Sequence, residues 1–130
     1  MYYYEKDYIM RLIHGIAQVL ARLLLGRQME EGAEIASVLN RQAREALDHL
    51  RRMTAAGEVN RAEERLFDLL ETAPWDRRQK AALVLSFYDD LNGRDDDFLA
   101  RADFSREEII EGLEDALRAV DLEIPEYLKI

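Results

Sequence analysis

The sequence has no cysteine, only two prolines, six glycines and one tryptophan among its 130 residues. The absence of cysteine excludes a disulfide framework and thiolate chemistry, and it fits a reducing cytoplasm. The scarcity of Gly and Pro excludes collagen-like and low-complexity chains. A chain of this length is long enough to bury its own core, and no stretch of it reads as a linker. We therefore expect a single helical domain over residues 1–130, located in the cytoplasm.

The chain also has few basic residues: it contains 18 Lys and Arg against 27 Asp and Glu, so its net charge is −9. The imbalance is uneven. Residues 1–55 contain eight Lys and Arg against seven Asp and Glu, whereas residues 56–130 contain ten against twenty. Nucleic-acid binding needs clustered Lys and Arg, so we exclude nucleic acid as the default partner. An acidic surface favours solubility and a basic partner.

No uninterrupted apolar run is long enough to cross a bilayer. The most apolar stretch, residues 7–26, is broken by five polar side chains: Asp7, Arg11, His14, Gln18 and Arg22. We therefore expect no membrane span. The tyrosines and acidic residues before this stretch also differ from the basic region and small-residue cleavage site of a signal peptide.

The same stretch predicts the helix around which the chain is organised. Its apolar residues fall on one wide face of a helix over residues 6–25: Ile9, Leu12, Ile13, Ile16, Val19, Leu20, Leu23 and Leu24. Gly26 stands where a C-cap glycine is common. A second segment, residues 81–88, is apolar nearly all round and should be deeply buried. We expect these two helices to form the core.

Helical periodicity and end signals predict five helices and no strand, over residues 6–25, 30–52, 60–73, 76–92 and 105–120. A short helical turn is possible at residues 95–101. Three starts carry the sequence of a capping box: Asn60 with Glu63, Asp76 with Gln79, and Ser105 with Glu108. Residues Tyr127, Leu128 and Ile130 follow Pro125 and could form a C-terminal flap. The predicted fold is an all-α, five-helix bundle of antiparallel helix pairs.

Ala62 and Pro74 stand at the spacing of the second-helix alanine and terminal proline of a tetratricopeptide repeat, and Leu83 and Phe87 match apolar positions of a following helix. The repeat's glycine is Val84 here, and its tryptophan is missing. Over about thirty residues the chain thus resembles this repeat. The resemblance implies a local TPR-like helix pair more than a repeat array.

Three further motifs occur in order along the chain. They are Asp-Tyr-Ile-Met-Arg-x-Ile at residues 7–13, Phe-Tyr-x-x-Leu at 87–91, and Phe-Ser-x-x-Glu-Ile-x-x-Gly-Leu at 104–113. In these motifs the chain resembles a family of small helical bacterial proteins of unknown function. The resemblance spans nearly the whole chain. It implies a TPR-like helical fold in a bacterial protein and brings no activity.

The two histidines offer little for a metal site, which needs convergent ligands. His14 has Met10 and Gln18 four residues away and is isolated along the helix, while His49 has Glu45 in reach for a hydrogen bond. The aspartates between residues 89 and 97 lack the late glutamate of a calcium loop, and a solvated loop with capping aspartates is the simpler interpretation. We predict no metal, no cofactor and no catalytic residue.

The excess apolar surface of residues 6–25, next to a run of tyrosines, favours a binding function, since Tyr is enriched in binding hot spots. We predict a protein-interaction or scaffolding module that forms a homodimer, its other partner unknown. The candidate interface residues are Tyr2, Tyr3, Tyr4, Tyr8, Leu12, Ile16, Val19 and Leu23. The alternatives are an N-terminal arm of tyrosines packed on the body, a membrane-surface helix, or a small enzyme using second-half carboxylates in a groove. Two carboxyl groups with raised pKa values in one pocket would favour the enzyme.

Overall fold

The computed structural model describes residues 2–26 and 35–122 of the chain. Within these ranges it has no strand, and it contains six α-helices and one 3-10 helix: α1 (Tyr2–Leu25), η2 (Ile35–Val38), α2 (Arg41–Ala55), α3 (Val59–Thr72), α4 (Arg77–Asn92), α5 (Asp96–Arg101) and α6 (Arg106–Ala119). The all-α prediction is confirmed. The predicted number of five helices is wrong, because the turn expected near residues 95–101 is the separate helix α5.

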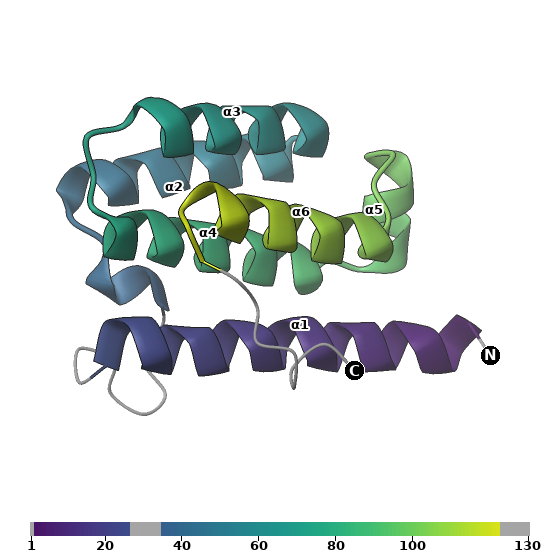
Figure 1. Cartoon of the computed structure of the whole chain (residues 1–130). Helices are drawn as coiled ribbons and strands as arrows, with labels where there is room; N and C mark the ends of the chain where they lie inside the picture. The colour runs from purple at the N-terminus through teal and green to yellow at the C-terminus, as the bar shows by residue number, and fades with distance from the viewer. Residues whose placement is uncertain (1, 27–34, 123–130) are drawn as a thin grey trace.

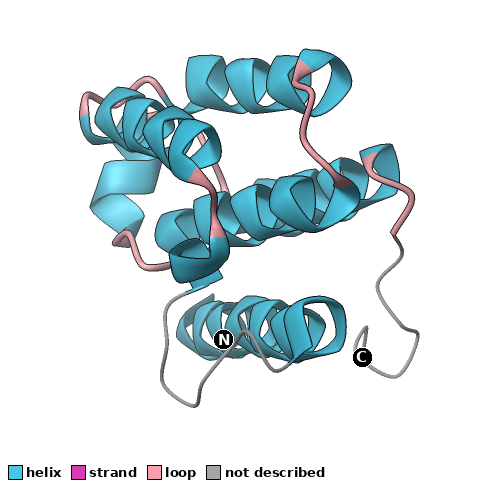
Figure 2. Cartoon of the chain, turned by 90° about the vertical axis from the view of Figure 1, so that its left-hand side faces the viewer, coloured by secondary structure: helices cyan, strands magenta, loops and turns pink. Residues whose placement is uncertain are grey.

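The helices lie in layers, with α1 along one edge of the molecule and the α2–α3 pair at the opposite side (Figure 1). Helix α4 lies between them and contacts α1, α2, α6 and η2. Figure 2, turned by 90°, also places α1 outside the remaining helices. Within the described ranges, none of the helices has the length and hydropathy needed to cross a membrane.

Helix α4 is the central helix, and all eight of its residues from 81 to 88 are buried. A helix that is apolar on every side is stable only when neighbours surround it. Asp76 caps its start, accepting a hydrogen bond from the Gln79 amide at 2.9 Å. The Gln79 side chain does not complete the expected capping box. It accepts from the Asn40 amide at 2.7 Å and donates to the Val38 carbonyl at 2.8 Å, tying η2 and α2 to α4.

The helix predicted over residues 30–52 is interrupted. Residues 27–34 lie outside the described ranges, η2 covers residues 35–38, and α2 begins only at Arg41. Asn40 has an extended backbone and its side chain accepts from the Ala43 amide at 2.9 Å. An Asn side chain that caps a following turn competes with continuation of a helix through it. The apolar periodicity alone therefore gave too long a helix.

Helix α3 begins at Val59 rather than Asn60, and the capping box predicted there is absent. The Asn60 side chain donates instead to the carbonyls of Ala102 and Asp103, both at 3.4 Å. Glu63, its expected partner, accepts from the Tyr88 hydroxyl at 2.7 Å. Tertiary contacts with α4 and the α5–α6 connection thus take both side chains away from the helix end.

Three other predicted ends agree with the structure, whereas the first helix begins at Tyr2 and not at residue 6, and α2 ends at Ala55 and not at residue 52. Ser105 and Glu108 form a reciprocal capping box at the start of α6, each bond 3.1 Å long. Helix α4 stops at Asn92, and Gly26 follows α1 with φ of +56°, a conformation that favours glycine. The predicted C-terminal flap at residues 127–130 lies outside the described ranges.

Candidate interaction surface

One face of α1 belongs to the core. Ile13, Ile16, Ala17, Leu20 and Ala21 are buried on the side that packs against α4 and α6. Ile16 is only 2% exposed, so this member of the candidate interface contributes to the core of the chain itself. Hydrophobic burial on this face fixes the position of the helix.

A second set of apolar side chains runs along the outer flank of α1. Tyr8 is 43% exposed and Leu23 is 64% exposed, and Leu12 and Val19 between them are half-buried. These four candidate interface residues follow one another at spacings of four, seven and four, which places them in one line on a helix. We call this line the α1 stripe.

The remaining candidates, Tyr2, Tyr3 and Tyr4, lie in the first turn of α1 and not in a separate arm. Only the backbone of this turn is described. The polar edge beside the α1 stripe contains Asp7, Arg11, Gln18 and Arg22.

Gly15 lies midway along the α1 stripe. A Cβ atom added at this position would have nothing within 4 Å. Glycine inside a helix costs roughly 0.5–1 kcal/mol relative to alanine. Packing among the described residues does not explain the choice of glycine at this point.

His14 is not isolated once the chain has folded. Its Nδ1 lies 3.2 Å from Asp89 Oδ1, and the two residues are 75 positions apart in sequence. Both line a cavity of about 490 Å³ between α1 and the end of α4, which Asn92 also lines. The Asn92 side chain donates to the Met10 carbonyl at 2.8 Å, and its buried Oδ1 has no partner in the described part of the chain.

The other side chains that could bind a metal ion do not come together. Glu45 pairs with Arg41 at 3.3 Å, and the hydrogen bond suggested between Glu45 and His49 is not seen among the described residues. Asp89 faces His14 and Asp95 caps α5, while Asp96 bridges Lys6 and Arg106. Over residues 2–26 and 35–122, no three His, Asp or Glu side chains converge into a group that could hold a metal ion.

A hydrogen-bonded pair of a buried tyrosine and a half-buried glutamate joins α3, α4 and α6. The Tyr88 hydroxyl donates to Glu63, and an added Cβ at Gly112 would collide with the Glu63 carboxylate and the Tyr88 ring. Burial raises the pKa of Glu63 despite the hydrogen bond from Tyr88, and the nearby Glu108 and Asp115 raise it further. Burial and the Glu63 carboxylate likewise raise the pKa of Tyr88. This pair stands against Gly112 and lines neither the His14 cavity nor the two cavities described next.

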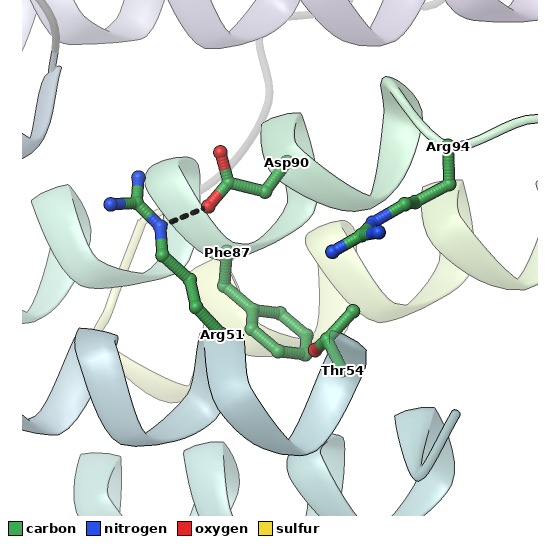
Figure 3. A pocket seen from close by; sticks show the side chains of 5 residues that line it. All are labelled: Arg51, Thr54, Phe87, Asp90 and Arg94. Atoms are coloured by element: carbon green, nitrogen blue, oxygen red, sulfur yellow. Dashed lines mark hydrogen bonds and ion pairs between the residues drawn. The ribbon is translucent and has the colours of Figure 1, made fainter. Parts of the chain in front are cut away.

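A cavity of about 400 Å³ opens between α2 and α4. Figure 3 shows its lining: Arg51 and Thr54 from α2, Phe87 and Asp90 from α4, and Arg94 just beyond α4. Arg51 Nε lies 2.6 Å from Asp90 Oδ2. A further cavity of about 380 Å³ lies between the end of α2 and α5, where it is lined by Phe98 and Arg101. Neither cavity is predicted from the sequence, since the residues that line each one come from separate elements and share no local spacing.

One protein-family model matches the chain over residues 3–121, and its description reads Family of unknown function (DUF6483). No curated protein and no solved structure matches the chain.

Proposed function

Because the chain belongs to the Family of unknown function (DUF6483), which assigns no activity, we propose from the geometry alone that it is a protein-interaction module that pairs with a second copy through α1. The observation that carries this proposal is the α1 stripe, a line of partly exposed apolar side chains on a helix at the edge of the molecule. An exposed apolar line of this kind is a common feature of interfaces, and two-fold pairing is the commonest way to cover it.

A second copy fits the α1 stripe because the stripe is self-complementary. In an antiparallel pair with a two-fold axis beside the Gly15–Ile16 peptide bond, Tyr8 faces Leu23 of the other copy. Leu12 then faces Val19 of the other copy. Gly15 lies at the crossing point, where the absence of a side chain permits close approach of the two helices.

The charges beside the α1 stripe favour the antiparallel orientation. A parallel pair would place Asp7 beside Asp7, Arg11 beside Arg11 and Arg22 beside Arg22. The antiparallel pair brings Asp7 of one copy within two residues of Arg22 of the other along the helix axis. Like charges at a helix pair destabilise it, and opposite charges set its orientation.

We also propose that the chain is a single TPR-like domain that works in the cytoplasm of a bacterium. Support for the helix pairing comes from α2 and α3, which run antiparallel side by side (Figure 1). The enzyme alternative has less support, because it needs two carboxyl groups of raised pKa in one pocket. Glu63, a carboxyl with a raised pKa, instead accepts the Tyr88 hydroxyl beside Gly112.

Light scattering at micromolar concentration tests the pairing. We expect twice the 15.2 kDa mass of the chain. Leu23→Glu and Val19→Glu should each give the monomer mass, because a buried unpaired charge opposes association. Gln42→Glu is the matched control, since Gln42 is exposed on α2, and it should stay dimeric. A wild-type monomer would refute the homodimer.

A charge swap tests the orientation separately. Asp7→Arg and Arg22→Asp should each weaken the dimer, and the double variant should recover it, since each copy then again presents opposite charges to the other. If the double variant is no tighter than the single ones, the antiparallel register is wrong even though a dimer forms.

A further inference from the structure

The cavity between α2 and α4 has a charge unlike that of the whole chain. The net charge of the protein is −9, yet two of the five described residues that line this cavity are arginines and one is an aspartate. Its volume of about 400 Å³ is in the range of small-molecule sites. Arginine presents several donors in a plane, and this geometry suits the oxygens of a carboxylate or a phosphate.

Among the described residues, neither guanidinium uses all its donors. Arg51 contacts Asp90 through Nε, and its two terminal nitrogens have no hydrogen bond to the described residues. The Arg94 guanidinium carbon lies 4.6 Å from the centre of the Phe98 ring, and this group has no ion pair within the described ranges. The cation–π contact holds Arg94 by its face, which leaves the N–H groups at its edge available.

The backbone that carries Arg94 is also fixed. Arg106 is only 7% exposed and donates to the carbonyls of Asn92 and Arg94, at 3.1 and 2.6 Å. Its Nε contacts Asp96 at 3.1 Å, and Asp96 in turn pairs with Lys6. A side chain on a backbone held in this way loses little freedom when it binds a ligand.

Phe87 and Thr54 lie between the two arginines and form the buried base of the cavity, since they are only 2% and 4% exposed. In Figure 3 the Arg94 side chain extends toward the Phe87 ring, and Thr54 lies beside that ring on α2. Arg51 lies on the other side of Phe87, next to Asp90. A ligand in this cavity would therefore be held mainly by the two guanidinium groups, with little contact to the Phe87 ring.

We propose that this cavity binds a small molecule that carries one oxyanion group, carboxylate or phosphate. Arg94 and Arg51 contact the oxygens, while Phe87 and Thr54 form the buried base of the cavity. The site is separate from the α1 stripe and does not depend on the proposed dimer.

Calorimetric titration with phenyl phosphate and with benzoate, at about 150 mM salt, tests the proposal and separates the two oxyanions. We expect at least one of them to bind. Arg94→Gln should weaken binding about tenfold or more, the usual consequence of losing one charged hydrogen bond. Arg51→Gln should weaken it similarly. Arg101→Gln is the matched control, because Arg101 lines the neighbouring cavity, and it should change affinity less than about twofold.

The outcomes are distinct. Binding of phenyl phosphate alone assigns a phosphate ligand, binding of benzoate alone assigns a carboxylate, and binding of both supports the shared chemistry. The proposal is overturned if neither compound binds, or if Arg101→Gln weakens binding as much as Arg94→Gln does. The variant Leu23→Glu should bind with unchanged affinity, so a failure of the dimer proposal does not affect this test.

Discussion

Helices α1 and α4 contain the two most apolar segments of the chain, and they occupy opposite kinds of position. Residues 81–88 of α4 are all buried because α1, α2, α6 and η2 surround them. Helix α1 buries one face against α4 and α6 and leaves Tyr8 and Leu23 exposed on its outer flank. Apolar content is therefore a poor guide to which helix is central. The number of neighbouring helices decides which helix is central. The apolar side chains that α1 leaves exposed form the surface that we propose for binding.

Truncation of a leucine side chain should give the largest difference in the free energy of unfolding between the two helices. Leu83→Ala in α4 should lower the free energy of unfolding by about 3 kcal/mol, because Leu83 is 0% exposed and its removal leaves a cavity. Leu23→Ala in α1 should change the stability of a single chain by less than about 0.5 kcal/mol, since Leu23 is 64% exposed. Urea unfolding measures both. Equal losses would contradict the central and edge positions.

Two glycine substitutions test how tightly the helices pack at α4 and at α1. Gly112→Ala should destabilise the protein by about 2 kcal/mol, because the new methyl group collides with Glu63 and with Tyr88 of α4. Gly15→Ala in α1 should stabilise the chain by about 0.5–1 kcal/mol, since its methyl group meets open space. Thermal unfolding in the Leu23→Glu background, where we expect monomers, separates this gain from any loss of dimer. A gain at Gly112 would show that α6 is not held tightly against α4.

The smallest expected effect concerns the polar contact of α4, the bond from Tyr88 to Glu63. The folded-state pKa of Glu63 is raised above its ordinary 4.5, so the folded protein holds this proton more tightly than the unfolded chain. The stability that this group contributes is complete below pH 4.5 and is lost as pH rises through the folded pKa. Glu63→Gln keeps an acceptor for Tyr88 and removes the titration.

Urea unfolding between pH 4 and pH 8 should therefore show Glu63→Gln gaining on the wild type as the pH rises, and then holding a constant difference. Glu63 is half-exposed, so water screens the group and the gain should be smaller than the two preceding effects. A difference that stays flat over the whole range would mean that Glu63 titrates normally in the folded protein.

Local signals predicted the parts of the fold that local chemistry controls. The box at Ser105, the cap at Asp76 and the end of α4 at Asn92 each depend on residues within about one helical turn, and all three are present. The same reasoning failed at Asn60 and Gln79, where side chains of suitable type bond to other elements instead. A capping pattern in the sequence indicates which hydrogen bonds can form at a helix end. Packing decides which are made.

Periodicity and capping signals predict that the chain is helical, where most helices end, and that both α1 and α4 carry apolar faces, because these features depend on residues that are neighbours in the sequence. Only the tertiary structure decided that α4 is central and α1 lies at the edge. It also brought His14 to Asp89, Tyr88 to Glu63, and Arg51 and Arg94 to one cavity. Such contacts join residues from different elements, and their geometry follows from how the helices pack against one another, which no short pattern encodes.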